Sequence, residues 1–188
     1  MFAWMCILLG LGDCFHLLPR VYGLLIEKNP TVVAAIGLGN AISSIGMALF
    51  YVIFLELIRI HYKKDLKCLR LATYFLFILR VVFVLLPQND WIHNTINLEM
   101  SCLRNAPFIL IGVIIDSLLF RFRREQLGDP LHNMWIWVLV SFGCYIPVAL
   151  IHLGGMKDAL LMTVKTIAYV IIAVSGYMRI PFDPIKKD

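Results

Sequence analysis

The residues best suited to chemistry in this sequence are charged groups inside apolar stretches. Asp13, His16 and Arg20 are spaced i, i+3 and i+7, so in a helix they line one face. Arg80 and Lys165 lie within two other apolar stretches. A charged side chain at the centre of a bilayer costs about 2.5–3.5 kcal/mol even on insertion scales, and such residues usually face a cavity or an internal partner. We therefore expect these five side chains to meet inside a helical bundle.

Two kinds of chemistry fit these groups. Arginine binds phosphate and carboxylate in a bidentate manner, so Arg20, Arg80 and Lys165 favour a net-positive pocket for an anionic amphiphile such as a lipid head group. Histidine is a common general base, so His16 oriented by Asp13 forms the expected catalytic pair if the protein modifies that ligand. The structural alternative is an ion-pair network from Asp13 to Arg80 or Lys165 that only joins helices.

Polar residues near the ends of neighbouring stretches are expected to complete the pocket. These further ligand-binding candidates are Asn40, Ser43, Asn89, His93, Arg104, Asn105 and His152. Ser43 would be a nucleophile only if His16 and Asp13 lay beside it, and no GxSxG motif supports that. The sequence contains no HExxH or HxxxH spacing, so it predicts no metal site. A Schiff-base chromophore on Lys165 is a remote alternative, so the sequence identifies no cofactor.

Six apolar stretches supply the elements that must position these residues. A helix that crosses a bilayer needs roughly 20 mostly apolar residues, and backbone groups in lipid must be satisfied within the helix. The spans are expected at residues 2–26, 31–58, 68–87, 104–120, 133–153 and 157–178. Hydrophobic residues make up 61% of the chain and charged ones 15%, whereas soluble domains carry about 25%. The predicted fold class is all-α: one polytopic, multi-pass integral membrane domain over residues 1–188, in the cell membrane if the source is a bacterium.

Basic residues between the stretches predict the orientation. Cytoplasmic loops carry an excess of Lys and Arg. The bases of the second loop, the fourth loop and the tail are Arg59, Lys63, Lys64, Lys67, Arg70, Arg121, Arg123, Arg124, Arg179, Lys186 and Lys187. The other loops hold only Lys28, Arg104 and Lys157. Both termini are thus predicted to be cytoplasmic, and the net charge of +5 is explained without a nucleic-acid partner.

Small residues and prolines predict close helix packing. The second stretch contains Gly37, Gly39 and Gly46, which let backbones approach where lipid supplies no hydrophobic drive. Pro19 lies inside the first stretch, where it has no N–H for the carbonyl of Phe15.

Three functions remain open at this point. The preferred one is a membrane-embedded protein whose polar pocket, in the outer half of the bilayer, binds or modifies an anionic amphiphile. A second is a small proton-coupled anion transporter that uses Asp13, His16 and Asp116. A third is a non-catalytic membrane subunit, as a homo-oligomer or with another membrane protein.

Overall fold

The computed structural model describes residues 2–25, 29–94, 97–123, 131–151 and 155–179, and the regular structure in these ranges is entirely helical. The elements are α1 (Phe2–Leu25), α2 (Pro30–Tyr62), α3 (Lys67–Leu85), the 3-10 turn η1 (Pro87–Asn89), α4 (Leu98–Phe122), α5 (Met134–Leu150) and α6 (Gly155–Arg179). The prediction of an all-α fold is confirmed.

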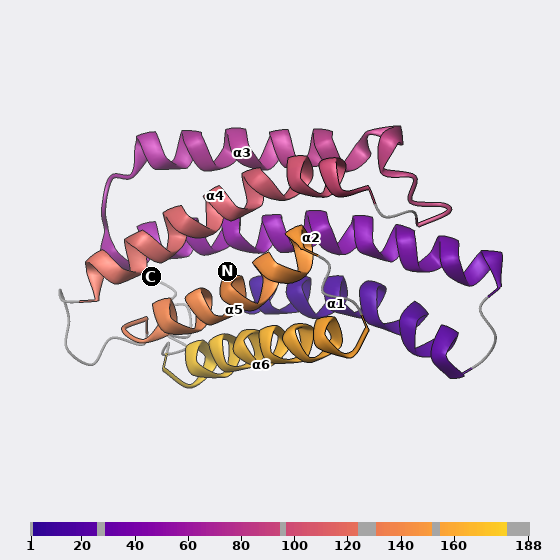
Figure 1. Ribbon diagram of the computed structural model, residues 1–188. Coiled ribbons are helices and arrows are strands. Elements are labelled where there is room, and N and C mark those ends of the chain that lie inside the picture. Colours follow the sequence, from indigo (N-terminus) through magenta and orange to yellow (C-terminus); the bar gives the residue numbers. More distant parts are fainter. Residues whose placement is uncertain (1, 26–28, 95–96, 124–130, 152–154, 180–188) are drawn as a thin grey trace, which may run out of the picture.

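The helices run side by side and alternate in direction (Figure 1). The long helix α2 packs against α1, α3 and α4, while α5 packs between α4 and α6, and α6 returns to α1. One end of the bundle holds the connections α1–α2, α3–α4 and α5–α6, and we call it the pocket end. The other holds the connections α2–α3 and α4–α5, and we call it the basic end.

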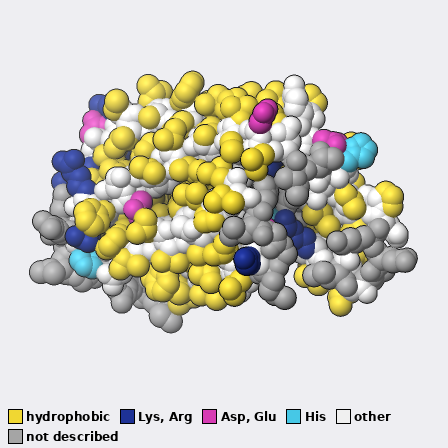
Figure 2. All heavy atoms as spheres, viewed as in Figure 1, with side chains coloured by type: hydrophobic (Ala, Val, Ile, Leu, Met, Phe, Trp, Pro, Cys, Tyr) yellow, Lys and Arg dark blue, Asp and Glu magenta, His cyan; other side chains and the backbone are white. Residues whose placement is uncertain are grey.

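The lengths and surfaces of the helices are those of an integral membrane protein. Five of them, all except α5, are long and apolar enough to cross a membrane. Helix α5 has 17 residues, which corresponds to about 25 Å of helix. Hydrophobic side chains cover much of the molecular surface (Figure 2), including Leu71, Phe75 and Ile78 on α3. Such a surface suits lipid as the surrounding solvent.

Local sequence explains where two helices differ from their expected bounds. Helix α4 begins at Leu98 and not at residue 104, because the Asn97 side chain caps it by accepting a hydrogen bond of 3.2 Å from the Met100 N–H. Helix α2 continues past residue 58 to Tyr62, where Lys63 in the left-handed conformation ends it.

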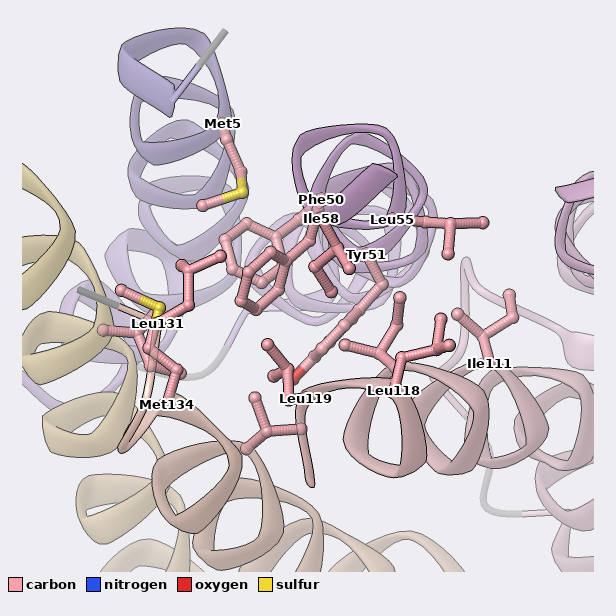
Figure 3. Packing of buried hydrophobic residues seen from close by; sticks show 14 of the residues in the cluster. Met5, Phe50, Tyr51, Leu55, Ile58, Ile111, Leu118, Leu119, Leu131 and Met134 are labelled. Carbon is pink, nitrogen blue, oxygen red and sulfur yellow. The ribbon is translucent and has the colours of Figure 1, made fainter. Parts of the chain in front are cut away.

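The hydrophobic core lies between α1, α2, α4, α5 and α6 (Figure 3). Its centre is aromatic: the ring of Tyr51 lies 5.5 Å from that of Phe108 and 5.2 Å from that of Phe142. Toward the basic end the same core contains only aliphatic and aromatic groups such as Leu55, Ile58 and Leu119, which are fully buried. The interior is therefore closed at that end by close-packed apolar side chains.

Helices α1 and α2 approach most closely at Gly39. A β-carbon at this position would collide with the backbone carbonyl of Phe15 on α1. Pro19 has no N–H for that carbonyl, so the oxygen of Phe15 is free to face the backbone of Gly39. The small-residue packing that the sequence predicts is present here.

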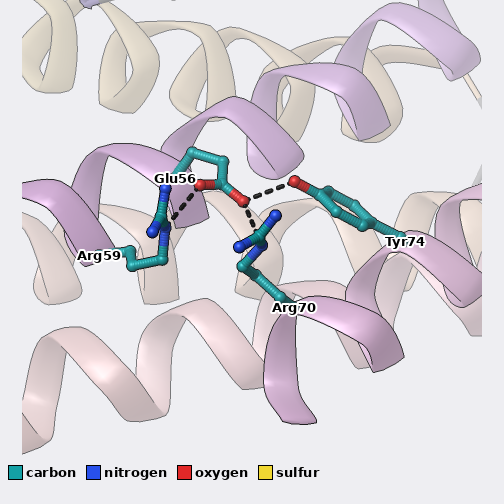
Figure 4. Close-up of polar contacts among 4 residues, drawn as sticks. All are labelled: Glu56, Arg59, Arg70 and Tyr74. Carbon is teal, nitrogen blue, oxygen red and sulfur yellow. Dashed lines mark hydrogen bonds and ion pairs between the residues drawn. The ribbon is translucent and has the colours of Figure 1, made fainter. Parts of the chain in front are cut away.

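The basic end is held by one carboxylate that binds two arginines (Figure 4). Glu56 on α2 accepts hydrogen bonds from Arg59 at 2.7 Å, Arg70 at 2.8 Å and the hydroxyl of Tyr74 at 2.5 Å. Because Arg70 and Tyr74 belong to α3, the cluster joins α2 to α3 beside their connection. The single carboxylate neutralises part of the charge of the two arginines, whose side chains are partly exposed to solvent.

The close approach at Gly39 gives a stability prediction. In Gly39→Ala the added methyl group must push α1 from α2, and overpacking of this kind typically costs about 1–3 kcal/mol. We expect a lower thermal unfolding midpoint in maltoside micelles, measured by intrinsic fluorescence. Gly143→Ala on α5 is the matched control, since a β-carbon there meets nothing within 4 Å. Equal midpoints for the two variants would refute this account of α1–α2 packing.

Candidate ligand pocket

A cavity of about 410 Å³ opens at the pocket end between α1, α2, α4, α5 and α6. This volume lies in the range of small-molecule sites. One wall is polar and is formed by His16, Arg20, Asn40, Ser43, Ser44, Asn94, Asn97, Ser101, Arg104, Asn105, Tyr145 and Asp158. The remaining lining is apolar or aromatic and comes from Met47, Trp91, Val148, Ala149 and Met162.

The structure gathers most of the residues that the sequence singles out. The candidates that line the cavity are His16, Arg20, Asn40, Ser43, Arg104 and Asn105. Arg80 and Lys165 are buried directly behind the lining, where each contacts a lining residue. Three candidates, Asp13, Asn89 and His93, lie elsewhere, as described below, and His152 is outside the described residues.

A hydrogen-bonded network connects α1 to α2 and to the third connection at the cavity wall. His16 Nδ1 lies 2.7 Å from Asn40 Oδ1, and Arg20 donates to the same oxygen at 3.4 Å. The Asn40 amide in turn donates to Asn94 Oδ1 at 3.4 Å. Asn40 therefore orients both α1 side chains toward the cavity.

Asp13 does not take the expected place beside His16. The Nδ1 of His16 is bound by Asn40, and Asp13 is half-buried on α1 outside the cavity lining. Its electrostatic partner is Lys165 of α6. The pair that the sequence suggests for general base catalysis is replaced by a His16–Asn40 pair, because α2 crosses α1 at this level.

Arg80 is the most deeply buried charged side chain of the described residues, with no exposed surface. Its Nε donates to the carbonyl of Ser44 at 2.9 Å, and its Nη1 donates to the carbonyl of Arg104 at 3.0 Å and to Asn105 Oδ1 at 3.3 Å. The guanidinium also lies 4.2 Å from the centre of the Phe108 ring, a cation–π contact. These groups solvate the charge and connect α3 to α2 and α4, but they do not neutralise it.

Arg104 is held at the rim by residues of η1 and of the third connection. It donates to Asn89 Oδ1 at 2.9 Å and stacks 4.7 Å from the centre of the Trp91 ring. The Asn89 amide donates to the carbonyl groups of Phe83 and Leu86 at 2.7 and 2.9 Å, which closes the end of α3. Asn89 thus lies behind the cavity and positions Arg104.

His93 lies away from the cavity, with an exposed side chain that pairs with Asp90 at 2.6 Å. It does not contribute to the lining. The turn after η1 directs it outward, while Trp91 and Asn94 of the same connection face the cavity.

Lys165 closes the floor of the cavity from α6. Its side chain is 4% exposed, and Nζ lies 3.1 Å from Met47 Sδ. The rings of Tyr145 and Tyr169 surround it, with centres 5.2 and 5.3 Å from Nζ. Polarisable sulfur and aromatic faces stabilise an ammonium group only partly.

The positive groups around the cavity exceed their negative partners. Within the part of the chain that the structure describes, neither Arg80 nor Lys165 forms a direct salt bridge, and Lys165 interacts with Asp13 only at longer range. Asp158 lines the cavity and interacts electrostatically with Arg20. The described carboxylates do not match Arg20, Arg80, Arg104 and Lys165, so the cavity carries a net positive potential.

Several lining residues are not predicted from the sequence. Tyr145 donates to Asn105 Oδ1 at 2.7 Å, and Ser101 donates to the Ala149 carbonyl at 2.8 Å. Ser101 lies one helical turn before Asn105, a spacing that could have indicated it. Tyr145 lies within an apolar helix, where an aromatic residue usually marks packing, so no sequence signal identifies it.

The described residues contain no group of three His, Cys, Asp or Glu side chains placed to hold a metal ion. Comparison of the chain with protein-family models, with curated proteins and with solved structures gives no match. The functional argument therefore rests on the chemistry of the cavity.

Proposed function

We propose that this protein binds an anionic amphiphile, with the head group in the positive cavity and the apolar part against its hydrophobic wall. The observation that carries the proposal is the buried charge of Arg80 and Lys165 without salt bridges in the described chain. An anion in the adjacent cavity would supply the missing negative charge.

The residues at the surface of the cavity are suited to a phosphate or carboxylate. Arg20 and Arg104 line it from two helices, α1 and α4, and guanidinium groups bind such anions through paired hydrogen bonds. The Ser43 hydroxyl is buried in the lining and has no hydrogen-bond partner among the described residues, so it is available as a further donor.

The apolar side of the cavity favours an amphiphile over a free ion. Met47, Val148 and Met162 contribute hydrophobic surface to the lining. A chain of methylene groups gains about 0.8 kcal/mol for each CH₂ that it buries. The same cavity thus offers favourable contacts to both the charged head group and the apolar chain of a lipid-like molecule.

The proposal includes the orientation of the bundle. We infer that all six helices span the membrane, with the termini and the basic end in the cytoplasm. Among the described residues, Lys63, Lys64 and Lys67 lie at the basic end with Arg121 and Arg123, and Figure 2 shows the basic side chains concentrated there. The positive-inside rule then places the cavity in the outer half of the bilayer.

Binding is tested with radiolabelled dodecyl phosphate and the full-length protein in maltoside micelles, by scintillation proximity. We expect saturable binding that Arg104→Gln weakens about tenfold or more, since a hydrogen bond to a charged group contributes about 1.5–3 kcal/mol. Lys67→Gln at the basic end, whose side chain is 84% exposed, is the control and should bind like the wild type.

Competitors separate the two halves of the ligand. Unlabelled dodecyl phosphate should displace the probe, whereas inorganic phosphate should do so only weakly and dodecyltrimethylammonium not at all. Equal displacement by the cationic amphiphile, or unchanged binding in Arg104→Gln, would contradict the proposal.

The orientation is tested in intact bacterial cells with a membrane-impermeant maleimide. In a variant without native cysteines, Ile92→Cys lies on the third connection and Lys64→Cys on the second. We expect Ile92→Cys to react in intact cells and Lys64→Cys only after the cells are permeabilised. The reverse pattern would mean that the cavity faces the cytoplasm.

A further inference from the structure

Polar groups continue from the cavity floor into the core along one face of α2. Asn40, Ser43, Met47 and Tyr51 are spaced i, i+3, i+7 and i+11, so they line a single stripe of the helix. The first three line the cavity. Tyr51 lies beyond the floor and is completely buried.

Residues of the other helices extend this stripe across the core. Met47 Sδ contacts Lys165 Nζ at 3.1 Å and the Tyr169 hydroxyl at 4.0 Å. Tyr51 interacts electrostatically with Tyr169, with Ser141 of α5 and with Asp116 of α4. The Tyr51 side chain points from α2 toward α4 (Figure 3). A series of neighbouring polar groups thus leads from the cavity floor to Asp116.

The polar groups at the far end of this series, away from the cavity, have buried oxygen atoms without hydrogen-bond partners. Tyr51 OH, Ser141 Oγ and Asp116 Oδ1 are buried and make no hydrogen bond to any described residue. Leaving such an atom unsatisfied costs about 1–3 kcal/mol, and proteins commonly satisfy such atoms with buried water. Three orphaned oxygen atoms on three helices therefore indicate a hydrated site.

Within the bundle, Asp116 has a polar connection toward the cavity. Its side chain is half-buried, and the neighbouring α2 and α4 side chains toward the basic end, Leu55, Ile58, Ile115 and Leu119, are buried and apolar. The buried polar groups nearest to Asp116 therefore lead through Tyr51 and Tyr169 toward the cavity.

The groups that oppose Asp116 do not neutralise its charge. Helix α2 contributes the phenol of Tyr51, which interacts with Asp116 and also with Ser141 of α5 and Tyr169 of α6. The charged groups of α2 and α3 in the same half of the bundle, Glu56, Arg59 and Arg70, bind one another with Tyr74 (Figure 4). Asp116 forms no salt bridge within the described residues. A carboxyl group in such surroundings is better tolerated when a proton makes it neutral.

We propose that Asp116 is a proton-binding site, and that protons reach it from the cavity through water held by Tyr169, Tyr51 and Ser141. In the uptake step a hydronium ion in the cavity gives up a proton, the intervening water and hydroxyl groups each accept one and donate one, and the carboxylate becomes a carboxylic acid. The step consumes one proton and leaves water and hydroxyl groups unchanged. This activity goes beyond anion binding and requires no bound anion.

The test uses infrared spectroscopy of the full-length protein in lipid bilayers without added ligand. A protonated carboxyl group in an apolar site has a resolved C=O stretch that shifts when its proton is exchanged for deuterium. We expect such a band in the wild type and its loss in Asp116→Asn. After a switch to D₂O, exchange of the band should be about tenfold slower or more in Tyr51→Phe and in Ser141→Ala, which corresponds to about 1.4 kcal/mol in the barrier.

The control is Tyr22→Phe, whose phenol is exposed on α1 and which should exchange at the wild-type rate. Circular dichroism and thermal midpoints of all variants confirm that they are folded. Absence of a band that Asp116→Asn removes, over the whole accessible pH range, would overturn the proposal. Wild-type exchange in both Tyr51→Phe and Ser141→Ala would overturn it as well, because protons would then reach Asp116 by another route.

Discussion

The burial of the Arg80 guanidinium is the constraint on which the rest of the structure depends. A charge without exposed surface must be solvated by the protein, and here two helices supply the groups: α2 the carbonyl of Ser44, and α4 the carbonyl of Arg104, the amide of Asn105 and the ring of Phe108. These contacts bring α2, α3 and α4 together at the cavity floor. Since hydrogen bonds to neutral groups leave the net charge in place, an anion in the adjacent cavity is favoured.

The two ends of the bundle hold arginine side chains in different surroundings. At the basic end Glu56 binds both Arg59 and Arg70, whose side chains are 35% and 37% exposed, so water helps to solvate the charge that one carboxylate does not neutralise (Figure 4). At the pocket end no described carboxylate forms a salt bridge with Arg80. A purely structural cluster would be expected to resemble the one at Glu56. The contrast between the two ends is what favours a binding role for the pocket.

The sequence predicts the elements and the convergence of polar residues better than it predicts their pairing. Helical spacing places His16 and Arg20 on one face of α1, and both line the cavity as that spacing implies. The partner of His16 depends on where α2 crosses α1, which Gly39 and the Phe15 carbonyl determine. No spacing within α1 reveals that crossing, so Asn40 and not Asp13 binds the imidazole. For the same reason, no pattern in their own segments predicts that Tyr145 and Asp158 line the cavity. Ligand binding by the lining residues remains a prediction.

The central claim is tested most directly by native mass spectrometry of the full-length protein, gently extracted from its membrane, with identification of any retained small molecule. We expect one anionic amphiphile for each chain, lost when Arg80→Met and Lys165→Met remove the two buried positive charges and retained in Lys67→Met. Retention of the same molecule after both charges are removed, or co-purification of only neutral and cationic lipids, would contradict it.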